Sequence, residues 1–158
     1  MHERDPRAVA SVSRALPRLV DVVPHRPPML LLDEVVAWDA NRVECRVVLR
    51  SDSPFVEAGR VASTLAIEYM AQCIAVFVGL EAHQRGEPIP LGYLVGARDI
   101  SLAPGGFRVG DVLTVEAVPI WGGQTLGSFQ CKVDRVGEVV AQGSLNVYRG
   151  ALGELARS

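Results

Sequence analysis

Hydrophobic residues follow two different periodicities along this chain, and these predict its main elements. Residues 29–38 are rich in strand-forming apolar side chains, and in residues 42–50 every second side chain is apolar while most neighbours are charged. Alternation with a period of two is typical of a strand with one buried face. Asp39-Ala40-Asn41 between them has turn chemistry. We therefore expect a β-hairpin whose first strand begins near Met29.

The segment that follows is apolar on all its sides. Residues 61–80 are almost continuously hydrophobic, a pattern typical of a helix enclosed by protein. The segment is also long enough to cross a membrane. Glu68 near its middle disfavours that alternative, because a carboxylate there costs about 2.5–3.5 kcal/mol. We expect a buried helix from about Ser63 to Gln84, with Gly86 as its stop.

Four further strands are expected in the second half of the chain. Turns rich in glycine separate them, and their ranges are 91–102, 111–120, 124–133 and 139–148. A hairpin, a long buried helix and an antiparallel run of strands give an α+β order, and a curled sheet wrapped around the helix is the simplest way to bury it. We predict one hotdog-fold domain over residues 1–158, with residues 1–15 flexible. A second chain would complete the open sheet edge in a dimer.

Composition and charge exclude several classes of protein. The chain has 158 residues, of which 49% are hydrophobic, and a net charge of −2. So much apolar surface excludes a disordered chain, and the lack of a basic excess disfavours nucleic-acid binding. Cys45, Cys73 and Cys131 lie far apart among apolar neighbours, and the N-terminus has no secretory pattern. We expect buried free thiols in a cytoplasmic protein without a membrane span.

Glu68 is the residue that the hydrophobic pattern does not explain. Acidic side chains are rarely buried without a partner, and a carboxyl group in apolar surroundings can serve as a general acid. Thr64, Glu68 and Gln72 lie at i, i+4 and i+8, so they form one polar stripe along the helix. The alternative is that Glu68 is structural and pairs with Arg60 or Arg98.

Other reactive groups lack the spacing that their chemistry needs. His2, His25 and His83 show no metal-ligand spacing, so we expect no metal site. Cys73 has no nearby histidine to activate it, and a buried thiol on an apolar helix is usually inert. The chain also lacks the Gly-x-Ser-x-Gly motif of a serine hydrolase.

Several segments resemble one known family, the hotdog 3-hydroxyacyl-[acyl-carrier-protein] dehydratases. The resemblance extends from about Leu16 to Tyr148 and keeps the order of the elements. Within the family the chain is most similar to the dehydratase-like proteins of aryl polyene (xanthomonadin-type) pigment synthesis. The matching segments are PHRPPMLLLDEV (24–35), IEYMAQ (67–72), GYLVG (92–96) and VGD (109–111).

The resemblance implies roles for several residues. Glu68 matches the helix carboxylate that handles the β-hydroxyl, and Gln72 would hold the carboxyl or the hydroxyl in place. Ser63 and Thr64, either of which can cap the helix, mark the amides that would receive the thioester carbonyl. No cofactor is implied, because the phosphopantetheine arm of an acyl carrier protein delivers the substrate. The remaining substrate-binding candidates are Tyr93 and Gly96.

The chain departs from the family in the loop before the helix. The family has a histidine there, the base that removes the α-proton, but residues 51–60 contain none. Losing such a base costs about 10²–10⁴-fold in rate. Either Glu57 or His25 replaces it, or a partner subunit supplies a histidine across a shared site, or this chain no longer dehydrates. Glu57 can equally be a solvated loop carboxylate.

Three functions remain open at this point. The first is a (3R)-hydroxyacyl-[acyl-carrier-protein] dehydratase, or the Glu-bearing subunit of one, which forms a trans-2-enoyl thioester. The second is a hotdog acyl thioesterase in which Glu68 activates water. The third is a non-catalytic acyl-binding or partner subunit of an active dehydratase. The expected partners are an acyl carrier protein and a second hotdog chain, identical or different, and the sequence does not define the acyl chain.

Overall fold

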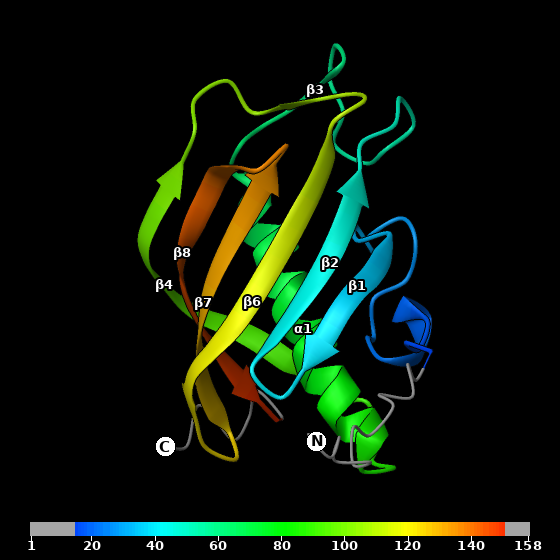
Figure 1. Ribbon diagram of the computed structural model, residues 1–158, viewed down its shortest axis with the longest axis vertical. Coiled ribbons are helices and arrows are strands. Elements are labelled where there is room, and N and C mark those ends of the chain that lie inside the picture. Colours follow the sequence, from blue (N-terminus) through cyan, green and yellow to red (C-terminus); the bar gives the residue numbers. More distant parts are fainter. Residues whose placement is uncertain (1–14, 151–158) are drawn as a thin grey trace, which may run out of the picture.

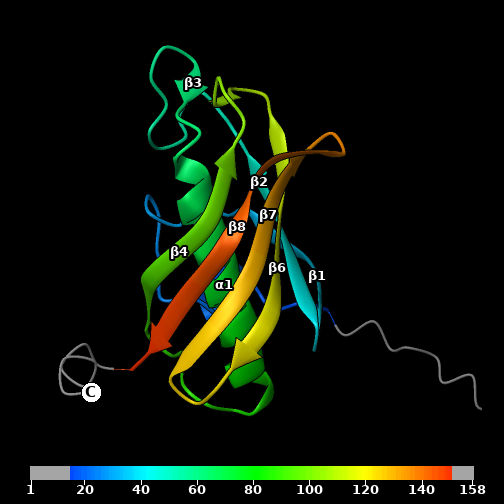
Figure 2. The ribbon, with the colours of Figure 1, turned by 90° about the vertical axis from the view of Figure 1, so that its left-hand side faces the viewer.

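A curled antiparallel sheet surrounds one long helix in the computed structural model, which describes residues 15–150 (Figure 1). The helix is α1 (Leu65–Gln84), and the six strands of the sheet follow the order β1-β2-β6-β7-β8-β4. Figure 2 shows α1 inside the curl, with β4 at one edge. This architecture confirms the predicted hotdog fold. The segment predicted to be flexible, residues 1–15, lies almost entirely outside the described residues.

The elements follow the predicted order, with two short additions. A 3₁₀ turn, η1 (Leu19–Asp21), precedes the hairpin, and β3 and β5 form a small second sheet at the top of Figure 1. The predicted hairpin turn is present, and Asp39 Oδ1 accepts a hydrogen bond from the N–H of Asn41 at 2.7 Å. The strands are β1 (Glu34–Asp39), β2 (Arg42–Val48), β3 (Arg60–Val61), β4 (Gly92–Leu102), β5 (Phe107–Arg108), β6 (Val112–Gly122), β7 (Leu126–Arg135) and β8 (Glu138–Arg149).

The first strand begins at Glu34, so the predicted start near Met29 is wrong. The N–H of Asp33 still donates to the carbonyl oxygen of Arg46 in β2, but the backbone of Met29 and Leu31 bonds to a helix side chain. The N–H of Leu31 donates to Gln72 Oε1 at 2.9 Å, and the carbonyl oxygen of Met29 accepts from Gln72 Nε2 at 2.8 Å. Apolar composition alone could not separate a strand from an extended segment held by a distant amide.

Helix α1 is enclosed by the protein, as predicted. Strands β2, β6 and β7 pack against it, and its buried side chains include Gln72. The helix is long and apolar enough to cross a membrane, but 67% of its most apolar stretch is buried inside the protein. The helix ends at Gln84, and Gly86 adopts the left-handed conformation, with φ at +69°, as expected for a helix stop.

Gly79 allows α1 to approach the segment after η1 closely. A Cβ atom at this position would overlap the carbonyl oxygen of Val22, and Val22 and Val23 are fully buried. We expect Gly79→Ala to lower the free energy of unfolding by about 1–3 kcal/mol, because the added methyl must displace backbone. Urea unfolding measures this change. Gly123→Ala, where a Cβ meets only the Leu126 carbonyl oxygen at 3.9 Å, is the control. Equal midpoints for the two variants would contradict the close packing.

The three cysteines are free and buried, as predicted from their neighbours. Burial raises the pKa of the Cys131 thiol to about 12 and raises the pKa of the Cys73 thiol well above its ordinary value. The thiolate is the nucleophilic form of cysteine, so both thiols are inert at neutral pH. They act as core side chains.

Candidate active site

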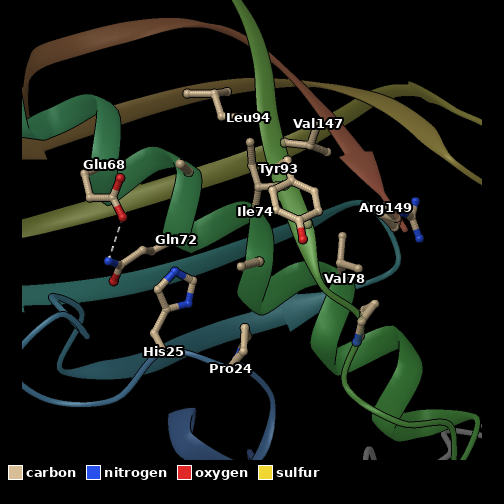
Figure 3. A pocket seen from close by; sticks show the side chains of 14 residues that line it. Pro24, His25, Glu68, Gln72, Ile74, Val78, Tyr93, Leu94, Val147 and Arg149 are labelled. Atoms are coloured by element: carbon tan, nitrogen blue, oxygen red, sulfur yellow. Dashed lines mark hydrogen bonds between the residues drawn. The ribbon is translucent and has the colours of Figure 1, made fainter. Parts of the chain in front are cut away.

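A pocket between α1 and β4 contains four of the residues chosen from the sequence (Figure 3). Helix α1 contributes Glu68 and Gln72, the segment before β1 contributes His25, and the start of β4 contributes Tyr93. The apolar part of the lining is Pro24, Ala71, Ile74, Ala75, Val78, Pro90, Leu94 and Val147. The pocket therefore combines a carboxyl, an amide and an imidazole with an apolar wall.

The amide of Gln72 has a defined orientation, because both of its ends bond to the protein. Gln72 is 1% exposed. Its Oε1 accepts from the N–H of Leu31, and its Nε2 donates to the carbonyl oxygen of Met29 and to Glu68 Oε1, the last at 2.9 Å. Since an amide oxygen cannot donate, these partners define which end faces Glu68. Of the two contacts predicted for Gln72, the hydrogen bond to the carboxyl group of Glu68 is present.

Glu68 is half-buried, and its carboxylate lies at one end of the pocket (Figure 3). The side chain of Arg60 donates to the carbonyl oxygen of Gly105 at 3.1 Å. Within residues 15–150 neither Arg60 nor Arg98 forms an ion pair with Glu68. The structural alternative for Glu68 therefore lacks its predicted partner, and the carboxyl is available to a ligand in the pocket.

His25 lies beside Gln72 in Figure 3 and points into the pocket. Its Nδ1 atom is buried and has no hydrogen-bond partner among the described residues. Buried polar atoms in proteins nearly always have a partner, so an unpaired nitrogen at a pocket wall leaves that partner for a ligand to supply. Of the two residues predicted to replace the missing base, His25 is the one that the structure brings to Glu68.

Glu57 lies in a different place. Its side chain is exposed on the loop before α1, and its backbone N–H and carbonyl pair with those of Arg60. Glu57 lines a second hollow together with Phe55, Arg60 and Thr64. Within one chain, then, Glu57 does not share the pocket of Glu68.

The start of α1 differs from the prediction that Ser63 or Thr64 caps it. Thr64 has helical backbone angles, φ −60° and ψ −22°, and its side chain makes no capping hydrogen bond. A capping side chain needs an extended backbone, which Thr64 does not have. The next three N–H groups, at 65–67, donate to carbonyls three residues earlier, whereas the N–H groups of Ser63 and Thr64 donate no backbone hydrogen bond within the described residues. The contact between these two amides and a thioester carbonyl stays a prediction. The Thr64 side chain lines the hollow that contains Glu57.

Two other predictions concern residues away from the pocket. Gly96 lies on β4, and a Cβ there would meet the Asn146 side chain at an ordinary 3.6 Å, so space does not require glycine. The described residues contain no group of three or more His, Cys, Asp or Glu that could hold a metal ion. Neither observation adds a residue to the site.

Arg149 is a pocket residue that sequence reasoning missed. It lines the same pocket as Glu68 and stands at the end of β8. The strand alternation contained a signal, because Leu145 and Val147 are buried and Arg149 is the next position on that face. Arg149 is therefore a charged residue on a face of β8 where the preceding side chains, Leu145 and Val147, are apolar.

The fold and the pocket define a hotdog-fold protein whose central helix carries a carboxyl group and an amide in a pocket. The profile of the family described as ApeP-like, ApeP dehydratase, matches residues 17–157. The chain belongs to this family of dehydratases, which are lyases that eliminate water. The resemblance in the helix and hairpin motifs is thereby confirmed.

Individual relatives agree with this assignment. The chain is 31% identical over 110 residues to the 3-hydroxyacyl-[acyl-carrier-protein] dehydratase FabZ of Chlamydia pneumoniae, an alignment that covers 65% of this chain and 70% of that protein. It is 34% identical to a chain of the dehydratase heterocomplex ApeI:P from Xenorhabdus doucetiae, with a TM-score of 0.84 over 91% of this chain and 97% of that one. The PaaI protein of Escherichia coli, at 13% identity, a TM-score of 0.57 and coverage of 73% and 81%, shares the fold alone.

Proposed function

We propose that this chain is the Glu68-bearing part of a dehydratase that acts on a (3R)-hydroxyacyl thioester carried by an acyl carrier protein. The observation that carries the proposal is the carboxylate of Glu68, oriented by Gln72 at one end of an apolar pocket. Membership of a dehydratase family and the substrate of the related FabZ support the same reaction.

The reaction is an acid–base elimination. A base takes the proton from the α-carbon, the electron pair of that bond forms the α,β double bond, and the bond from the β-carbon to oxygen breaks. Glu68 gives its proton to the departing hydroxyl, so water leaves and the trans-2-enoyl thioester remains. Amides at the start of α1, near Ser63 and Thr64, would stabilise negative charge on the thioester oxygen. These steps consist of two proton transfers and the loss of water, and the proposal includes no metal or cofactor.

In this proposal the base belongs to a second hotdog chain. The described loop before α1 contains no histidine, and a similar solved chain comes from a dehydratase heterocomplex. The pocket lies against β4, an edge strand with exposed Leu94 and Val95. A partner on this edge would cover apolar side chains and close the pocket. We place the complex in the cytoplasm, with residues 1–158 as one domain.

His25 is a second candidate for the base, because its unpaired Nδ1 lies in the Glu68 pocket. The test compares the chain alone with the chain co-purified with a second hotdog protein, and uses mass spectrometry to follow 3-hydroxyacyl carrier protein. We expect the enoyl product only from the complex, and we expect His25→Asn in the complex to retain activity like the exposed control His83→Asn.

Each other result has a defined meaning. Turnover by the chain alone, lowered about 10²–10⁴-fold by His25→Asn, would assign the base to His25 and contradict the partner. Release of a free acid would identify a thioesterase. If the complex turns over substrate equally well without the Glu68 carboxyl, this chain is a non-catalytic subunit.

A further inference from the structure

Arg26 is a charged side chain that bonds to backbone oxygens just before the segment held by Gln72. One guanidinium nitrogen, Nη1, donates to the carbonyl oxygens of Val23 and His25, each at 2.8 Å. Within the described residues Arg26 forms no ion pair, so its contribution comes from these two directed contacts. A permanently charged donor thus fixes the shape of the chain where it reaches the pocket.

The neighbouring prolines explain why a side chain is needed as the donor. Three of the residues 24–28 are prolines, which have no N–H group. No backbone N–H of the described residues donates to the carbonyl oxygen of Val23 or of His25. Backbone carbonyls in folded proteins are nearly always paired, and charged donors form the stronger hydrogen bonds. Arg26 therefore supplies the donor that the prolines lack.

The contact with Val23 joins Arg26 to a fixed part of the chain. The side chains of Val22 and Val23 are fully buried. The backbone of Val22 lies so close to α1 that a Cβ atom at Gly79 would overlap its carbonyl oxygen. Because this part of the chain is packed tightly against the helix, a turn bonded to it keeps its position relative to α1.

The turn anchored by Arg26 carries both backbone partners of Gln72. The carbonyl oxygen of Arg26 accepts from the N–H of Met29 at 2.9 Å and from the N–H of the next residue at 3.1 Å, which closes the turn. The carbonyl oxygen of Met29 and the N–H of Leu31 then bond to the amide of Gln72. The same amide donates to Glu68. A continuous path of backbone and hydrogen bonds therefore connects the Arg26 guanidinium to the carboxyl of Glu68.

We propose that Arg26 is a positioning residue of the dehydration, which orients the Glu68 carboxyl by holding the turn of residues 26–30 in place. The inference rests on the proposed function, because it takes Glu68 as the acid. Arg26 is exposed and is not among the residues that line the Glu68 pocket, so it acts through the turn and not on the substrate. A displacement of about 1 Å at a reacting group costs about 10²-fold in rate, so a small shift of the turn is sufficient.

The first test measures dehydration by the complete complex with Arg26→Met, which keeps an apolar stem but donates no hydrogen bond. We expect kcat to fall about tenfold or more while KM changes little, because the substrate keeps its contacts and only the acid is displaced. Arg26→Lys keeps a charged donor and should recover part of the loss. The matched control is Arg18→Met, at an exposed arginine that bonds to the side chain of Asp21 instead of to the backbone, and it should leave kcat unchanged.

A double-mutant cycle shows whether Arg26 acts through Gln72. Gln72→Met removes the amide that connects the turn to Glu68, so adding Arg26→Met to it should lower kcat no further. If the losses of the two single variants multiply in the double variant, the residues act independently and the inference is overturned.

Amide hydrogen exchange in the same complex gives a readout that does not depend on activity. In Arg26→Met the N–H of Leu31, the donor to Gln72, should exchange about tenfold faster, because the turn opens at a lower free-energy cost. The N–H of Asp33, which donates to a carbonyl oxygen of β2, is the reference and should exchange as in the parent.

Two results would contradict the positioning role of Arg26. One is exchange at Leu31 equal to that of the parent, and the other is a lower Tm with an unchanged kcat of the folded complex, which would make Arg26 purely structural. Full activity of Glu68→Gln would overturn the proposed function and the catalytic role of Arg26 with it. Faster exchange at Leu31 would then still show that Arg26 holds the turn, so the two failures are distinguishable.

Discussion

Glu68→Gln is expected to lower the rate of dehydration about 10²- to 10⁴-fold, the usual contribution of a positioned general acid. Glutamine nearly preserves the shape of the side chain, and its amide can still meet Gln72. It cannot give a proton to the departing hydroxyl. The rate constant for conversion of 3-hydroxyacyl to enoyl carrier protein, followed by mass spectrometry in the complete complex, measures the effect.

An exposed carboxyl provides the matched control for this variant. Glu138 is exposed to solvent at the start of β8, whereas the pocket residues Val147 and Arg149 lie at the end of that strand, so Glu138→Gln should leave the rate unchanged. Thermal unfolding of both variants shows whether any loss arises from instability. If Glu68→Gln turns over substrate as fast as the parent, Glu68 is not the acid.

Gln72→Met is expected to affect stability and catalysis together. The change removes the acceptor for the buried N–H of Leu31 and the donor to Glu68. An unsatisfied buried amide costs about 1–3 kcal/mol, so the free energy of unfolding should fall by that amount. Glu68 also loses the group that orients it, and we expect a loss of about tenfold or more in kcat, in line with about 1.4 kcal/mol per tenfold change in rate.

The separate readouts distinguish a positioning role from a purely structural one. Gln84→Met, at the exposed end of the same helix, should change neither stability nor rate. In Gln72→Met kcat should fall while KM changes little, because the amide bonds directly to the acid, and a merely structural glutamine would leave kcat of the folded protein unchanged. An unchanged kcat at reduced stability would remove Gln72 from the site.

Local patterns were sufficient for most of the fold. The alternation in residues 42–50 predicts β2, and the apolar run after Arg60 predicts α1 with its end before Gly86. The exception is the stretch from Met29 to Leu31, which has strand composition but bonds to Gln72. Its partner lies about forty positions away in the chain, as the separations of 41 and 43 residues show. The strand propensity of a segment depends on its own residues and does not reflect a contact with a residue so far away in the chain.

The candidate site, like the fold, was predicted from local sequence patterns only in part. The sequence by itself determined that Glu68 and Gln72 share a helix face, because four residues make about one helical turn and the turn brings i and i+4 together. Only the tertiary structure decided that His25 and Arg149 join them and that Glu57 does not. Those placements depend on how the segment before β1, the end of β8 and the loop before α1 pack around the helix. Such packing is set by contacts between residues far apart in the chain, and no short-range spacing encodes it.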